Sequence, residues 1–125
     1  MAVTYFNNKR HQIDVLITAN ATITVAGNNS VSNIAYGTDQ TVIGAGIKQI
    51  WAMSPSGNSA YWTISRGANL VAAPDSTAYL DFAGNGSSLN VDSTGTIVVT
   101  LVGATVGTLM LTLHKQGELP DGSTY

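Results

Sequence analysis

The side chains that could carry out catalysis or bind a metal are few and scattered. The two histidines, His11 and His114, lie at opposite ends of the sequence, and no HxH or HExxH spacing accompanies them. Six aspartates and one glutamate occur singly, with Asp75 and Asp81 as the nearest candidate pair for a two-carboxylate hydrolase. Cysteine is absent, which removes thiolate ligands and thiol nucleophiles. The sequence therefore predicts no enzyme, no metal and no cofactor.

Aromatic side chains offer a different chemistry, because exposed rings on a β-sheet can stack on sugar rings. Trp51, Tyr61 and Trp62 lie close together in the sequence and form the candidate glycan-stacking set. Their apolar neighbours, including Ile50 and Ile64, favour packing in a core instead. Both interpretations stay open from the sequence.

Charge is unusually sparse in this chain of 125 residues. Lys and Arg number 5, Asp and Glu number 7, and together they form 10% of the chain, against roughly 25% in ordinary soluble domains. No basic patch could neutralise phosphates, so we expect no nucleic-acid partner. No apolar run is long enough to span a bilayer, and no apolar segment follows the first charges, so we expect neither a membrane segment nor a secretory signal. Surfaces made of Thr, Ser, Asn and Gly can enter interfaces without desolvating ions.

The ends of the chain differ from its centre. Residues 1–11 read as an N-terminal arm, and residues 117–125 read as a C-terminal tail without periodicity. An arm that combines aromatic and basic residues could dock on a neighbouring subunit, whereas the alternative is a frayed terminus. The candidate partner contacts are Tyr5, Phe6, Lys9, Arg10, Leu119 and Tyr125.

Residues 12–116 show the alternation of a single β domain. Apolar residues recur at every second position in 13–17, 97–101 and 109–113, which is the strand signature. The glycines of segment 103–107 predict a hairpin between the last two of these strands, and Pro55-Ser56-Gly57-Asn58 predicts another that would hold both tryptophans. No stretch holds a helical period. Short strands separated by Gly, Pro, Asn and Ser predict an antiparallel β-sandwich or barrel, jelly-roll-like, with extended arms.

The most distinctive stretch is IKQIWAMSPSGNSAYWTISRGANLVAAPDSTAYLDFAG, residues 47–84. Its YWTISRGAN and YLDFAG segments, followed by GTLMLTLHK at residues 107–115, resemble small virion structural proteins of tailed bacteriophages, especially marine ones. The likeness consists of strand and turn patterns, so it transfers no site residues.

The resemblance implies a particle component, most simply a capsid decoration (cement) protein that binds the major capsid protein on the capsid surface. A tail or head-fibre component is the alternative within this class, and a carbohydrate-binding adhesin module is the alternative outside it. A homo-oligomer, a trimer or a dimer, is expected from the low-charge surface.

Overall fold

A computed structural model describes residues 3–38, 40–53, 60–67, 69–74, 77–81, 94–104 and 107–118. Within these ranges the chain forms nine strands and no helix. The strands are β1 (Val3–Phe6), β2 (Gln12–Ile17), β3 (Ala21–Ile23), β4 (Thr41–Ala52), β5 (Tyr61–Arg66), β6 (Asn69–Ala72), β7 (Ala78–Asp81), β8 (Ile97–Val102) and β9 (Leu109–Glu118). The all-β prediction is confirmed.

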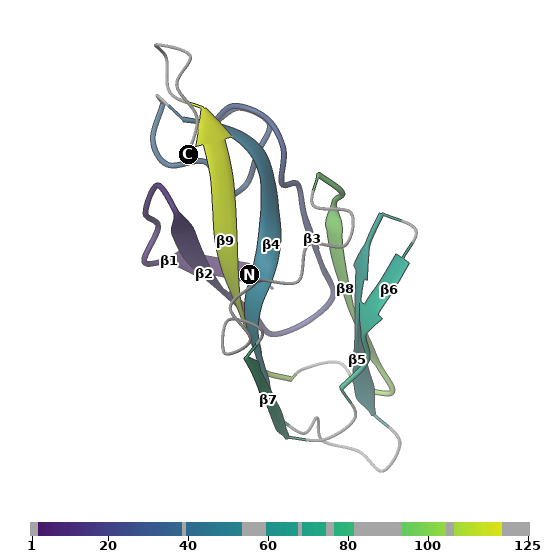
Figure 1. The fold of residues 1–125 in the computed structure, drawn as a ribbon. Helices are drawn as coiled ribbons and strands as arrows, with labels where there is room; N and C mark the ends of the chain where they lie inside the picture. Colours follow the sequence, from purple (N-terminus) through teal and green to yellow (C-terminus); the bar gives the residue numbers. More distant parts are fainter. Residues whose placement is uncertain are drawn as a thin grey trace.

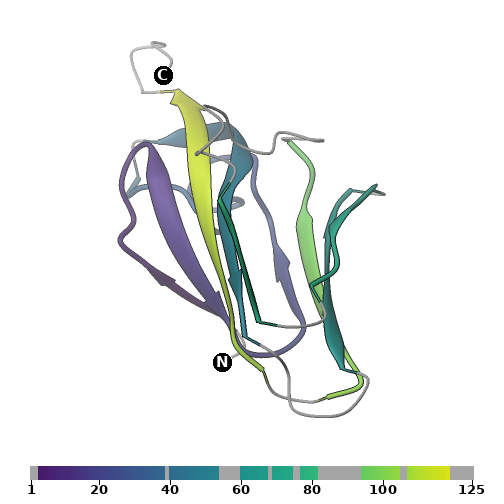
Figure 2. The same cartoon turned by 60° about the horizontal axis from the view of Figure 1, so that its bottom comes forward.

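The strands form two antiparallel sheets that face each other (Figure 1). One sheet has five strands in the order β1-β2-β9-β4-β7, and the other has four in the order β3-β8-β5-β6. Figure 2 shows the two sheets as separate layers. The pairings are nested, because β5 pairs with β6, β4 with β7, β3 with β8 and β2 with β9. This architecture is a β-sandwich.

The core lies between the sheets and is built from the alternating apolar positions. In the five-stranded sheet, β2, β4 and β9 place one face of aliphatic side chains inward, and their register aligns Val15, Leu111 and Ile50 across the three strands. In the facing sheet, Ile64 of β5 pairs with Val99 of β8, and both are buried. Burial of this aliphatic layer is the main driving force for folding.

Both predicted hairpins around the central turns are wrong in their pairing. Residues 97–102 and 109–118 are strands as expected, but β8 belongs to the four-stranded sheet and β9 to the five-stranded sheet. In the same way, β4 with Trp51 and β5 with Trp62 lie in different sheets. The physical reason is that the two strands of each pair bury their apolar faces toward each other from opposite sheets instead of forming one ribbon. Gly103, with φ of 84°, begins the connection after β8.

Described residues of both predicted terminal arms belong to strands. Residues 3–6 are the edge strand β1, which pairs with β2 from Val3 opposite Ile17 to Phe6 opposite Asp14. At the other end, β9 continues through Glu118, so only residues 119–125 of the predicted tail fall beyond it, and these lie outside the described residues.

The segment between β3 and β4 is a loop, with no strand in residues 31–36. Ile34 from this loop is nevertheless fully buried in the core. The hydroxyl of Ser32 fixes the local turn by donating to the carbonyl oxygen of Val25 at 2.6 Å and accepting from the amide of Ile34 at 3.2 Å. The loop therefore closes the end of the sandwich as a packed element.

Candidate functional site

The outer face of the four-stranded sheet contains no charged side chain among its described residues. Its outward positions alternate with the buried ones on β5 and β8, and neighbouring strands continue the pattern. The residues of this surface, called here the neutral face, are Thr22, Tyr61, Thr63, Ser65, Leu70, Val98, Thr100 and Val102. Hydroxyl groups, aliphatic groups and the ring of Tyr61 form it, so a partner could cover it without removing an ion from water.

The outer face of the five-stranded sheet has a different chemistry and a concave shape. An open groove of about 620 Å³ crosses β2, β9, β4 and β7. This volume falls within the ~300–1,000 Å³ typical of small-molecule sites. The lining residues are Gln12, Asp14, Gln49, Trp51, Tyr79, Met110 and Thr112.

The groove residues form two rows that run across the strands. One row is polar, because Asp14 is opposite Thr112 and Thr112 is opposite Gln49. The other row lies two residues further along and is apolar and aromatic, with Met110 opposite Trp51 and Trp51 opposite Tyr79. Two residues along a strand correspond to ~6.7 Å. The groove therefore presents hydrogen-bonding groups beside an aromatic wall.

The polar row is held in place by hydrogen bonds. Asp14 accepts from Thr112 Oγ1 at 2.8 Å and from Asn7 Nδ2 at 2.9 Å, one bond to each carboxylate oxygen. Gln12 Oε1 accepts from Lys48 Nζ at 3.2 Å, which leaves its amide group free to donate. These bonds fix the carboxylate and one amide before any ligand arrives.

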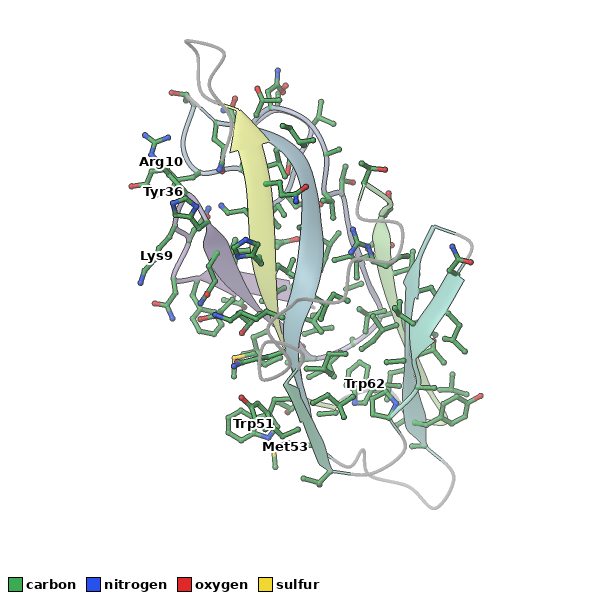
Figure 3. The ribbon with its side chains drawn as sticks, in the orientation of Figure 1. Lys9, Arg10, Tyr36, Trp51, Met53 and Trp62 are labelled. Carbon is green, nitrogen blue, oxygen red and sulfur yellow. The ribbon has the colours of Figure 1, made fainter. Side chains whose placement is uncertain are left out.

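The aromatic wall consists of two exposed rings. Trp51 and Tyr79 have ring centroids 6.5 Å apart and an interplanar angle of 78°, an edge-to-face arrangement. They are 50% and 57% exposed. Figure 3 shows Trp51 and Met53 pointing away from the sandwich at one end of the five-stranded sheet.

The structure separates the three aromatic residues that the sequence grouped for glycan stacking. Trp62 is fully buried between the sheets, so its ring has no face available to a glycan (Figure 3). Tyr61 is exposed on the neutral face of the other sheet, and Trp51 lines the groove. Core packing, favoured for the set from the sequence, applies to Trp62 only. Tyr79 supplies the second ring of the wall, and no sequence argument singled it out.

The predicted contact residues near the N-terminus lie on or beside β1. Tyr5 is half-buried against the core, and burial raises the pKa of its phenol. Phe6 and Lys9 are exposed, while the guanidinium of Arg10 lies over the ring of Tyr36 with 5.2 Å to the centroid. Figure 3 shows Lys9, Arg10 and Tyr36 together at the opposite end of the molecule from Trp51. Leu119 and Tyr125 lie outside the described residues.

Two buried cations were missed by the sequence argument. Lys115 is fully buried, and its ammonium donates to Asn8 Oδ1 at 2.6 Å, to the carbonyl oxygen of Ile34 at 2.9 Å and to Gln40 Oε1 at 3.2 Å. Burial lowers the pKa of Lys115 to about 8, from 10.5. Three acceptors match the three donors of the ammonium, so the charged form is well accommodated at neutral pH.

Arg66 is the second buried cation, and it reaches from β5 to Ala45, the residue of β4 that pairs with Lys115. Its Nε donates to the carbonyl oxygen of Gly95 at 3.1 Å and its Nη1 donates to that of Ala45 at 2.8 Å. The alternation of inward and outward positions along each strand could have identified both residues as inward-facing. Lys115 continues the inward positions of Leu111 and Leu113, and Arg66 continues those of Trp62 and Ile64. Both cations hold loops to the sandwich and neither lines the groove.

Among the residues that the structure describes, no group of three or more His, Asp or Glu side chains could hold a metal ion. Of the acidic pair suggested by the sequence, Asp75 and the side chain of Asp81 lie outside the described residues. In the described ranges no helix is long and apolar enough to cross a membrane. No protein-family model, curated protein or solved structure matches this chain.

Proposed function

We propose that this chain is a structural component of a tailed-phage virion, a capsid decoration (cement) protein that binds the assembled shell through its neutral face. The observation that carries the proposal is the composition of that face. Tyr61, Leu70 and Val98 expose apolar surface among hydroxyl side chains, and none of the described outward residues of this sheet is charged. Val98 and Leu70 lie on either side of Ser65 in the register, and exposed apolar side chains gathered on one face favour a protein interaction site.

A decoration protein stabilises a shell by linkage, because it binds the assembled lattice and not the free subunit. The major capsid protein is the proposed partner, and the capsid surface is the proposed location. Broad contact with a neutral face suits this task, since many modest contacts across subunit junctions add up without ion pairs. The neutral face spans all four strands of its sheet, and none of its described residues carries a charge.

The nested strand pairing supports the same class of protein. We infer a jelly-roll connectivity from the pairing of β2 with β9, β3 with β8, β4 with β7 and β5 with β6. Jelly rolls recur in viral capsid proteins and in lectins. One fold hosts many functions, so the fold only supports the virion proposal. The proposal rests on the composition of the neutral face.

A location in a tail or head fibre is the alternative within the same class. Both locations fit a homo-oligomer, a trimer or a dimer, and both would use an uncharged contact surface. Electron microscopy of intact virions labelled with an antibody to this chain separates them, because capsid decoration predicts label over the whole head and a fibre location predicts label at one vertex or on the tail.

The residue-level experiment is cosedimentation of the purified protein with shells assembled from the major capsid protein of the same phage. Thr63→Lys places a cation in the middle of the neutral face, and Thr4→Lys on the outer face of β1 is the matched control. We expect Thr63→Lys to lose shell binding about tenfold or more, which corresponds to ~1.4 kcal/mol, while Thr4→Lys binds as the wild type does. Equal binding by both variants would reject the neutral face as the contact surface. Binding of the wild type to free subunits as tightly as to shells would reject the decoration role.

A further inference from the structure

The groove on the five-stranded sheet is on the side of the sandwich away from the neutral face, so shell binding leaves it available. Four strands contribute its lining, and its polar and aromatic rows are in register across the sheet. Its chemistry is also distinct, because a carboxylate, two amides and a hydroxyl lie beside two exposed rings. Such an arrangement calls for a ligand with both hydrogen-bonding groups and a flat apolar face.

The backbone beneath the groove excludes one class of ligand. β9 pairs with β2 on one side and β4 on the other, and β4 also pairs with β7. An extended peptide that binds by strand addition needs an unpaired edge, which β2, β9 and β4 lack. Of the strands under the groove, β7 alone is at the end of the described sheet, and a strand added there would lie beside the groove and not over it. Recognition in this groove therefore depends on side chains.

The charges around the groove disfavour a second class. Asp14 is the only ionised side chain among the described lining residues, and the ammonium of Lys48 is bonded to the lining residue Gln12. A phosphate, a sulfate or an acidic sugar would meet the Asp14 carboxylate and no cation in the described lining. The lining therefore favours a neutral ligand.

A neutral saccharide satisfies both requirements. Pyranose rings present a C–H face that packs on an aromatic ring, and their hydroxyls both donate and accept. Asp14 can accept from a hydroxyl while Gln12 can donate to one, and the side chain of Gln49 makes no hydrogen bond to any residue that the structure describes. An amide that bonds none of the described residues, on the same face as an oriented carboxylate, is suited to bind a ligand hydroxyl.

We propose that the groove of Trp51, Tyr79, Asp14 and Gln49 binds a neutral saccharide, with the sugar ring packed on Trp51 and its hydroxyls bonded to Asp14 and Gln49. The proposal is independent of the virion role, because it concerns the opposite sheet and a different class of partner. In a particle component, such a groove would attach the particle to neutral glycans on a surface.

The test uses the full chain and defined probes. Affinity electrophoresis in gels containing a neutral glucan, mannan, galactan or xylan identifies a neutral probe, and hyaluronan and alginate serve as acidic probes. Titration of the best neutral probe, followed by tryptophan fluorescence, then gives the affinity. We expect retardation by at least one neutral polysaccharide and by neither acidic one. Absence of retardation by all the neutral probes, or retardation by the acidic ones alone, would overturn the proposal.

Three variants locate the site. Trp51→Ala and Gln49→Ala remove one group from each row, and Tyr61→Ala removes an exposed ring from the other sheet as the control. We expect Trp51→Ala to weaken binding about tenfold or more and Gln49→Ala about threefold or more, while Tyr61→Ala leaves the affinity unchanged. Equal affinity in all three variants would place saccharide binding elsewhere and overturn the assignment. A wild-type oligomer that becomes a monomer in Trp51→Ala would assign the groove to contact between copies of this chain, which also overturns it.

Discussion

The buried ammonium of Lys115 makes stability depend on pH in a direction that the structure fixes. Lys115→Met replaces the charged group with an apolar side chain of similar length. Three oxygens, from Asn8, Ile34 and Gln40, then lose their donor. Buried acceptors left without a donor cost ~1–3 kcal/mol, so we expect the variant to be less stable than the wild type by about that amount at pH 7.

The pH dependence follows from the pKa of Lys115, which burial lowers to about 8 in the folded chain from 10.5. Between these two values the unfolded chain holds the proton and the folded chain has released it. Stability therefore rises with pH in this window, and it is independent of this group below pH 8. Relative to Lys115→Met, the wild type should gain ~2 kcal/mol between pH 7 and pH 9.5.

The assay is urea unfolding of both proteins at several pH values from 7 to 9.5. Comparing the difference in unfolding free energy between the two proteins cancels other titrating groups, such as the Tyr5 phenol. Lys9→Met, which removes an exposed cation, is the control and should keep a constant offset from the wild type. A gap between the wild type and Lys115→Met that stays flat across this range would show that the ammonium reaches water and would refute the description of this buried network.

Two further predictions concern the core around Trp62, and thermal unfolding followed by circular dichroism checks both. A methyl group added at Gly107 would lie 2.7 Å from Cζ2 of Trp62, so Gly107→Ala should destabilise the fold by ~1–3 kcal/mol. Adding Trp62→Phe to the same chain should recover part of this loss. An unchanged melting temperature in Gly107→Ala would contradict the close packing of Gly107 on Trp62. Trp62→Ala should cost ~3–5 kcal/mol, whereas Trp51→Ala, which truncates an exposed ring, should cost less than ~0.5 kcal/mol; the reverse order would contradict the assignment of Trp62 to the core.

Strand positions and inward faces were predictable from the sequence because alternation reports directly on burial. The period-two pattern in segments 13–17, 97–101 and 109–113 marks side chains that the structure buries. The same pattern cannot report which strand is the neighbour. In this chain the strands before and after Gly103, β8 and β9, are neighbours in sequence but belong to opposite sheets.

The candidate groove could not be predicted, for a related reason. Its polar row joins Asp14, Gln49 and Thr112 from three strands that are far apart in the sequence. Each is an ordinary outward residue of its own strand, and only the register brings them together. The predicted aromatic set was wrong for a different reason. Trp51 and Trp62 are near each other in sequence but belong to strands of different sheets. One ring is therefore exposed on an outer face, and the other is buried in the core.

The most direct test of the proposed function is the salt dependence of attachment to the shell. Decorated particles are washed at increasing NaCl concentration, and the protein retained on them is measured. A contact made by the neutral face has few ion pairs to screen, so we predict that retention changes little up to several hundred millimolar salt. Steep release at moderate salt would contradict this account and would move the contact to the cationic residues Lys9 and Arg10.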